Sequence, residues 1–266
     1  MKYKLVAADM DGTLLNDRSE LSGRTKAAII GAVEAGAIFV TATGRPLIGA
    51  GMINSLIKKD MPVIIFNGAA AFMWRALTNL FSIYLDAGLA KEVYDASMEI
   101  GVPAVVWTGK GMWVNRVCEA TLWYRDLYNI EMGVVENIYD LEEEGIYKLL
   151  WLETPETVSR LQKEMSSRFQ GRLICHSSRP TMLEFVNLEA EKGSAMAAIG
   201  KLYGVDRSEM IAIGDGYNDI SMLKYAGLGV AMDNAPPDVK AACANVAPGN
   251  NEDGAAIMIE KYILGL

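Results

Sequence analysis

Short apolar runs and amphipathic segments alternate at both ends of the chain. Runs such as 5–8 and 210–213 contain no polar residue, which is typical of strands buried on both faces of a parallel sheet. The segments between such runs carry apolar residues at helical spacing. The pattern predicts strands at 4–8, 37–43, 62–68, 210–215 and 227–232, and helices at 22–36, 46–58, 193–204, 220–227 and 251–263. We therefore expect an α/β fold, with a Rossmann-like doubly wound parallel sheet core.

The ends of these helices carry residues that favour starting or stopping a helix. Ser22 is expected to be the N-cap of the first helix, because a serine hydroxyl can accept a hydrogen bond from a free amide of the first turn. Gly36 and Gly204 lie where helices are expected to end. The boundaries of these segments therefore agree with their periodicity.

The middle of the chain has a different pattern. It predicts a helix at 89–100, a β-hairpin at 103–116 that turns at 109–111, and a further helix before a strand at 147–154. A helix at 155–169 and two strands paired around Arg179–Pro180 follow. A helix followed by two antiparallel strands thus occurs twice, which favours an inserted α+β domain. We expect a core domain of residues 1–83 and 184–266, and an inserted cap domain of residues 84–183.

Composition and charge narrow the possible functions. The chain has 266 residues, with 25 Lys and Arg against 33 Asp and Glu, and the net charge of −8 disfavours nucleic acid or an anionic membrane as a partner. Three scattered cysteines and one histidine argue against a disulfide framework or a zinc site. We expect no leader segment, no membrane span, a cytoplasmic location, and a monomer or small homo-oligomer.

Polar residues gather where the predicted strands end. Asp9 and Asp11 follow the first strand only one residue apart, and such close carboxylates repel each other unless a cation or water lies near them. Because ligands bind at the carboxyl ends of parallel strands, these residues are expected to converge with those after the other strands. The segments at the ends of three other predicted strands are Thr43–Arg45, Asn67–Gly68 and Gly214–Asp219. Lys192 lies at the start of the helix before the strand predicted at 210–215.

This set of residues is suited to phosphoryl transfer. Mg²⁺ prefers oxygen ligands, which Asp9, Asp11 and Asp215 can supply. A carboxylate can attack phosphorus and form an aspartyl-phosphate, while a second carboxylate moves protons. Lys192 offers a positive charge, and Thr43 and backbone N–H groups offer hydrogen bonds to phosphate oxygens.

Four motifs occur in a characteristic order: "DMDGTLL", "TATGR", "EKGSA" and "GDGYND". With these motifs the chain resembles the haloacid dehalogenase (HAD) superfamily of aspartate-nucleophile phosphatases. Three further features resemble the Cof-type sugar-phosphatase branch of this superfamily: the inserted domain, the motif "FNGAA" before it, and the motif "NNEDGAA" near the end of the chain. The resemblance implies a Mg²⁺-dependent phosphatase that acts on small phosphorylated metabolites, with sugar phosphates favoured.

The resemblance also implies roles for individual residues. Asp9 is implied as the nucleophile, and Asp11 as the general acid and base that also gives a backbone carbonyl to Mg²⁺. Asp215 is implied as a metal ligand, with Asp219 supporting it or a metal-bound water. The implied phosphate-binding set is the Met10 amide, Thr43, Gly44, Lys192 and Asn218. Arg45 is implied to contact substrate where the cap meets the site.

Other interpretations stay open at this point. The same residues would serve a phosphomutase, which returns the phosphoryl group to the sugar, or a phosphometabolite-binding regulator with vestigial chemistry. Arg45 also fits a surface charge, and Asn67 and Asn250 fit turns as well as substrate contacts. An EF-hand is excluded, because Leu14 stands at the position that requires glycine and a strand precedes the loop.

Overall fold

The computed structural model describes residues 2–266 and divides into two compact units. The core unit consists of the residues up to Phe81 together with Ala190–Leu266, and the inserted unit is Ser82–Glu189. The sequence prediction placed the second boundary too early, after residue 183. Residues 184–186 complete strand β11 (Met182–Val186), whose backbone pairs with the sheet of the inserted unit, so the chain leaves that unit later.

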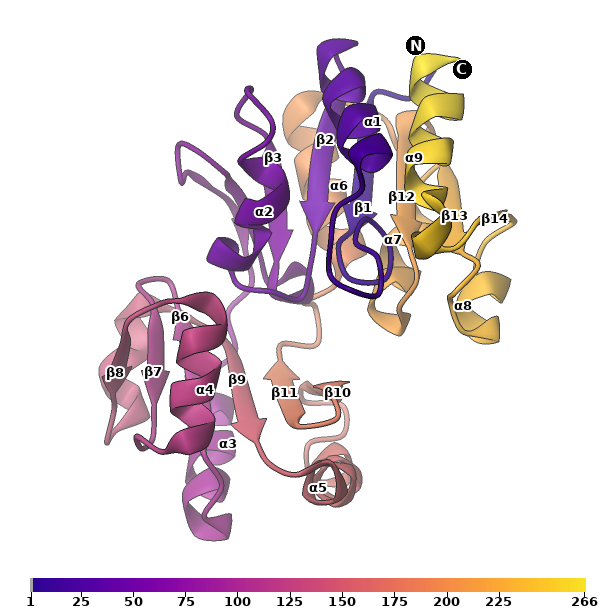
Figure 1. Ribbon diagram of the computed structural model, residues 1–266. Coiled ribbons are helices and arrows are strands. Elements are labelled where there is room, and N and C mark those ends of the chain that lie inside the picture. Colours follow the sequence, from indigo (N-terminus) through magenta and orange to yellow (C-terminus); the bar gives the residue numbers. More distant parts are fainter. Residues whose placement is uncertain (1) are drawn as a thin grey trace. The chain divides into compact units, whose positions relative to one another are not determined.

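The core unit is built on one eight-stranded sheet in the order β14-β13-β12-β1-β2-β3-β4-β5 (Figure 1). The six strands from β14 to β3 are parallel, and β4 runs antiparallel to β3. This confirms the predicted α/β core, with a mixed edge that the sequence did not indicate. The strands are β1 (Leu5–Asp9), β2 (Ile38–Ala42), β3 (Pro62–Ile65), β4 (Ala70–Met73), β5 (Asn79–Ser82), β12 (Met210–Gly214), β13 (Leu228–Met232) and β14 (Asn245–Ala247).

Helices cover both faces of the core sheet. Leu5, Ala7 and Val40 share one buried cluster with Met196 of α6 and Met222 of α7. The alternate strand residues point to the opposite face, where α1 and α9 pack against each other (Figure 1). The helices are α1 (Gly23–Glu34), α2 (Gly51–Asn54), α6 (Lys192–Tyr203), α7 (Ile220–Tyr225), α8 (Pro237–Ala241) and α9 (Gly254–Ile259), which continues as a π-helical turn (Glu260–Leu264).

Local signals at helix ends are confirmed at two positions, whereas one helix is much shorter than predicted. The Ser22 side chain accepts a hydrogen bond from the Thr25 amide at 3.0 Å, and Gly204 caps α6 in the left-handed conformation. The helix expected at 46–58 is only a 3₁₀ turn (Leu47–Ala50) followed by α2. Gly49 and Gly51 lie within the expected range of 46–58, and glycine lowers the stability of a helix.

The inserted unit is a six-stranded sheet in the order β10-β11-β9-β6-β7-β8. Trp151 and Phe185 form the centre of its core with ring centroids 4.7 Å apart, on the face that α3 and α5 cover. On the other face, Tyr124 of α4 accepts a hydrogen bond from Trp107 at 3.2 Å. Its elements are α3 (Ala87–Ile100), β6 (Ala104–Thr108), β7 (Met112–Val114), α4 (Glu119–Tyr128), β8 (Met132–Val134), a 3₁₀ helix (Ile138–Glu144), β9 (Ile146–Leu152), α5 (Pro155–Arg168), β10 (Ile174–Arg179) and β11.

The two predicted strand pairs of this unit are confirmed. β6 and β7 form an antiparallel hairpin, and β10 pairs with β11 in the same way. β8 was not predicted; it adds a short parallel strand beside β7. Among residues 2–266, no helix is both long and apolar enough to cross a bilayer.

Candidate active site

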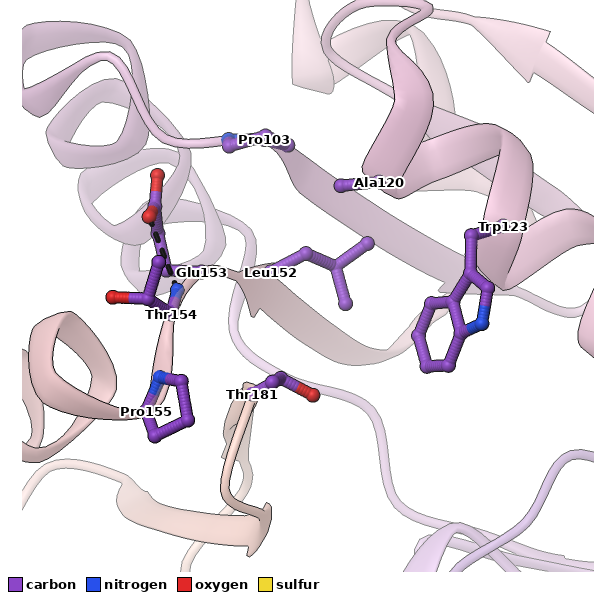
Figure 2. Close-up of a pocket in the computed structure, with 8 residues that line it drawn as sticks. All are labelled: Pro103, Ala120, Trp123, Leu152, Glu153, Thr154, Pro155 and Thr181. Carbon is purple, nitrogen blue, oxygen red and sulfur yellow. Dashed lines mark hydrogen bonds between the residues drawn. The ribbon is translucent and has the colours of Figure 1, made fainter.

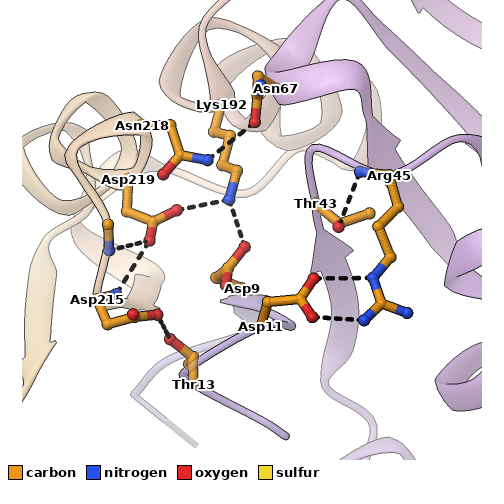
Figure 3. Close-up of polar contacts among 11 residues, drawn as sticks. Asp9, Asp11, Thr13, Thr43, Arg45, Asn67, Lys192, Asp215, Asn218 and Asp219 are labelled. Atoms are coloured by element: carbon orange, nitrogen blue, oxygen red, sulfur yellow. Dashed lines mark hydrogen bonds and ion pairs between the residues drawn. The ribbon is translucent and has the colours of Figure 1, made fainter. Parts of the chain in front are cut away.

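The residues after three parallel strands of the core unit lie together (Figure 3). Asp9 ends β1, Thr43 directly follows β2, and Asp215 directly follows β12. β1 lies between the other two strands, and its residues Ala8 and Asp9 pair with Ile213 and Ala42. The strand ends therefore bring the predicted motifs to one edge, as expected for a parallel α/β sheet.

Lys192 lies at the centre of this group and is completely buried. Its Nζ is 2.5 Å from Asp9 Oδ1 and 2.6 Å from Asp219 Oδ1. Burial would lower the pKa of Lys192, but the charges of Asp219 and Asp9 outweigh it and raise that pKa above its ordinary value. The two aspartates therefore favour the charged form of Lys192, although it is the first residue of α6, where a helix alone disfavours positive charge.

Three carboxylates form a cluster at this lysine, which contacts two of them. One oxygen from each of Asp9, Asp215 and Asp219 lies within 4.8 Å of the others. Burial raises the pKa of Asp9 well above its ordinary value, and it raises the pKa of Asp215 to about 6. Besides burial, the charges of neighbouring aspartates raise both pKa values, and the cluster has three carboxylates for one lysine. Because the donors are clustered carboxylate oxygens, the site fits a hard divalent cation such as Mg²⁺.

The loop after β1 and the turn after β12 support these carboxylates. The Thr13 hydroxyl donates a hydrogen bond to Asp215 Oδ1 at 2.6 Å. Gly12 permits this approach, because a Cβ at that position would lie 2.3 Å from Asp215 Oδ2. Asp219 Oδ2 accepts hydrogen bonds from the backbone N–H groups of Asp215 and Gly216, at 3.0 and 2.8 Å. The sequence analysis missed Thr13, although the motif "DMDGTLL" contains it.

Asp11 lies outside the carboxylate cluster. Its side chain is 46% exposed and pairs with Arg45 through both oxygens, with 2.8 Å between Arg45 Nε and Asp11 Oδ2. The Asp11 carboxylate is therefore not part of this cluster, and the metal contact implied for Asp11 through its backbone carbonyl stays a prediction. Arg45 neutralises Asp11, and a two-pronged contact between guanidinium and carboxylate favours this pairing.

The residues implied to hold phosphate surround the cluster. Thr43 is buried, and its Oγ1 accepts a hydrogen bond from the Arg45 amide at 3.1 Å. Met10 and Gly44 directly follow β1 and Thr43. Asn218 lies in the turn after β12, and its Nδ2 donates to Asn67 Oδ1 at 2.8 Å (Figure 3). Backbone and side-chain donors thus flank the cluster from separate segments.

A recess lies within the inserted unit, and its chemistry differs from that of the carboxylate cluster (Figure 2). It has a volume of about 470 Å³. Trp123, Leu152 and Pro155 give it a mainly apolar wall, and Glu153 is the acidic residue among those that line it. No group of charged side chains converges there, so the carboxylate cluster is the better candidate for catalysis.

Comparison with known proteins shows the family of this chain. Residues 6–259 match the family of haloacid dehalogenase-like hydrolases, and the chain belongs to this family. The superfamily and the Cof-type branch predicted from the motifs are thereby confirmed. The predicted enzyme class is confirmed as well: the protein is a hydrolase of the phosphatase type.

Relatives align with almost the whole chain. YxeH of Bacillus subtilis (strain 168) is 30% identical over 98% of this chain and 99% of its own length. YcsE of the same organism, named a 5-amino-6-(5-phospho-D-ribitylamino)uracil phosphatase, is 29% identical over 98% of this chain and 96% of its own length. The crystal structure of a haloacid dehalogenase-like hydrolase from Bacteroides thetaiotaomicron superposes with a TM-score of 0.86 at 28% identity, covering 97% of this chain and 99% of that chain.

Proposed function

We propose that this phosphatase is Mg²⁺-dependent and hydrolyses small phosphorylated metabolites, preferably sugar phosphates, through an aspartyl-phosphate on Asp9. The observation that carries the proposal is the cluster of Asp9, Asp215 and Asp219, in which one buried lysine contacts Asp9 and Asp219. Such a cluster is costly without a further cation, and buried charge of this kind is typical of functional sites.

Asp9 is the proposed nucleophile because it is held by its backbone at the end of a rigid strand. One of its oxygens accepts a hydrogen bond from Lys192, and the other is the proposed attacking atom. Attack forms the bond between Asp9 Oδ and phosphorus and breaks the bond to the alcohol oxygen of the substrate. Lys192 balances the charge that gathers between Asp9 and the phosphoryl oxygens.

Asp11 is the proposed proton carrier. In its protonated form it gives a proton to the departing alkoxide, and as a carboxylate it then takes a proton from the attacking water. That water hydrolyses the aspartyl-phosphate, which releases orthophosphate and restores Asp9. Because Asp11 pairs with Arg45, its side chain has to exchange the guanidinium for the leaving group, and Arg45 then becomes available to the substrate.

The proposed metal ligands are Asp9 and Asp215, supported by Asp219, with the backbone carbonyl of Asp11 as a further donor. Bound Mg²⁺ would neutralise the carboxylates and the phosphate oxygens and so reduce their repulsion. Thr43, Asn218 and the amides of Met10 and Gly44 are the proposed donors to the remaining phosphate oxygens.

The inserted unit is the proposed cap that selects substrates. The family resemblance supports this role, and the name of the relative YcsE, which specifies a phosphorylated ribityl compound, supports a small polyol or sugar phosphate as substrate. The net charge of −8 favours small substrates over nucleic acids.

Steady-state hydrolysis of an aryl phosphate, then of a panel of sugar, nucleotide and short-chain phosphates, tests the proposal. We expect turnover that requires Mg²⁺ and stops with a chelator. In Asp9→Asn, kcat should fall by roughly three orders of magnitude or more while the circular dichroism spectrum is unchanged. Wild-type activity in Asp9→Asn would refute the nucleophile, and an isomerised sugar phosphate in place of orthophosphate would indicate a mutase.

A further inference from the structure

The turn that follows β3 has an unusual backbone. Phe66, Asn67 and Gly68 all have positive φ angles, of 51°, 58° and 101°. Asparagine and glycine adopt this left-handed conformation at little cost, whereas for phenylalanine it is a rare and costly outlier, and consecutive left-handed residues are rare. Each strained residue costs about 1–3 kcal/mol, and such strain persists where the surrounding structure requires it, often at functional sites.

The surroundings of this turn explain how the strain is maintained. The backbone N–H of Asn67 donates a hydrogen bond to the Thr43 carbonyl at 3.1 Å, and the backbone N–H of Phe66 donates one to the Arg45 carbonyl at 3.2 Å. On the opposite side, a Cβ at Gly68 would lie 2.2 Å from the backbone carbon of Glu191, directly before Lys192. The turn is thus packed between the segment that follows β2 and the start of α6.

The Asn67 side chain reaches a third segment of the site. Asn67 is 5% exposed, and its Oδ1 accepts the hydrogen bond from Nδ2 of Asn218, which is exposed (Figure 3). A Cβ at Gly44 would lie 2.7 Å from the same Oδ1, so only glycine at that position leaves Asn67 its place. A buried carboxamide therefore anchors an exposed one that the proposed function assigns to phosphate.

We propose that Asn67 is a positioning residue, which holds the Asn218 carboxamide in the orientation that receives a phosphate oxygen. The inference rests on the proposed function, since it requires Asn218 to bind phosphate. With one Asn218 N–H engaged by Asn67, the second N–H is oriented before the ligand arrives. Less rotational freedom is then lost on binding, which improves affinity without any contact between Asn67 and the ligand.

The test compares Asn67→Ala, Asn67→Gly, Asn218→Ala and the Asn67→Gly/Asn218→Ala double variant. In each variant we expect KM for an aryl phosphate to rise, and the affinity for orthophosphate measured by calorimetry in Mg²⁺ to fall, by about tenfold. kcat should change by less than about threefold. Because Asn67 acts through Asn218, the double variant should be no weaker than Asn218→Ala alone.

The remaining variants separate positioning from turn strain. Asn67→Gly tolerates the positive φ, so a purely structural role predicts wild-type KM in that variant, whereas the inference predicts the full rise. Asn129→Ala is the matched control: Asn129 is a left-handed asparagine that caps α4 in the inserted unit, and its loss should lower stability but leave KM unchanged.

Three outcomes decide the matter. Wild-type KM and orthophosphate affinity in Asn67→Gly, or additive losses in the double variant, would overturn the inference while the proposed function stands. A wild-type protein that neither hydrolyses aryl phosphate nor binds orthophosphate in Mg²⁺ would overturn the proposed function and the inference with it.

Discussion

The two units of this protein each contain a buried lysine, and the two lysines have different surroundings. In the core unit, Lys192 contacts Asp9 and Asp219 at the ends of parallel strands. In the inserted unit, Lys148 lies within β9, with its Nζ 2.9 Å from Glu184 Oε1 on the neighbouring strand. Both lysines are no more than 1% exposed.

The balance of charge separates the two clusters. Lys148 is paired with the Glu184 carboxylate, and burial lowers the pKa of the nearby His176, whose Nε2 is 3.7 Å from Glu184 Oε2, which favours the neutral ring. Lys192 contacts Asp9 and Asp219, and one carboxylate oxygen of Asp215 lies within 4.8 Å of an oxygen of each of these two aspartates. A balanced pair needs no ligand, whereas an excess of buried carboxylates requires a further cation or bound protons.

The net charge of each unit does not reveal which unit holds the carboxylate cluster. Residues 82–189 contain 10 Lys and Arg and 17 Asp and Glu, a formal charge of −7, whereas the rest of the chain has 15 and 16, a formal charge of −1. Yet the unbalanced buried cluster lies in the nearly neutral core unit. Chemistry depends on where charges are buried, since exposed charges are screened by water and salt.

Exchanging each lysine for methionine should show this difference most strongly. In Lys192→Met, kcat should fall about 10³-fold, because the lysine no longer balances the negative charge of Asp9 and of the phosphoryl oxygens. In Lys148→Met, kcat per folded molecule should change less than about threefold. Initial rates with an aryl phosphate, corrected for the folded fraction, measure both. Equal losses in the two variants would remove the functional distinction.

In the inserted unit, we expect the loss of the buried lysine to affect stability and not catalysis. Lys148→Met leaves Glu184 buried without its cation and should lower the free energy of unfolding by about 3–5 kcal/mol. The Lys148→Met/Glu184→Leu double variant should recover most of this loss, because an apolar pair of similar volume can replace a buried ion pair. Urea denaturation measures both values; failure of the double variant to recover would show a further role for the polar pair.

Metal addition should stabilise the core unit through its carboxylates. At about 100 times its dissociation constant, Mg²⁺ should raise the free energy of unfolding by about 2.7 kcal/mol relative to protein in a chelator. The rise should be lost in Asp215→Asn and retained in Glu153→Gln, which changes a carboxylate of the inserted unit. Thermal melts with and without Mg²⁺ measure this effect. An equal shift in both variants would argue against binding at the cluster.

The smallest expected effect is the pH dependence that His176 contributes. Because burial lowers its pKa, the unfolded chain binds the proton at higher pH than the folded protein. Stability should therefore fall as pH decreases below about 6.5, until the folded histidine also becomes protonated. Denaturation in Mg²⁺ between pH 5 and 8 should show a shallower slope for His176→Gln than for wild type, and identical slopes would contradict burial of a neutral ring. His176 is the only histidine of the chain, which makes the comparison clean.

The sequence predicted the long, strongly apolar elements and missed short or irregular ones. β1, β2 and β12 were expected because they contain runs of buried apolar residues. β8 and β14 have three residues each, too few for a periodic pattern, whereas β7 is as short but follows the turn at 109–111 that marks a hairpin. β8 and β14 form because a neighbouring strand offers free backbone groups. The strand expected at 62–68 stops at Ile65, because the left-handed turn that begins at Phe66 cannot continue a strand.

The amino-acid sequence by itself determined the fold class, the family and the segments that converge, since strand ends of a parallel sheet must meet at one edge. Only the tertiary structure decided the partners: Asp11 with Arg45, Thr13 with Asp215, and Asn67 with Asn218. The physical reason is that such contacts depend on side-chain direction and on close approach between segments distant in the chain. Periodicity and motif spacing carry no information about either.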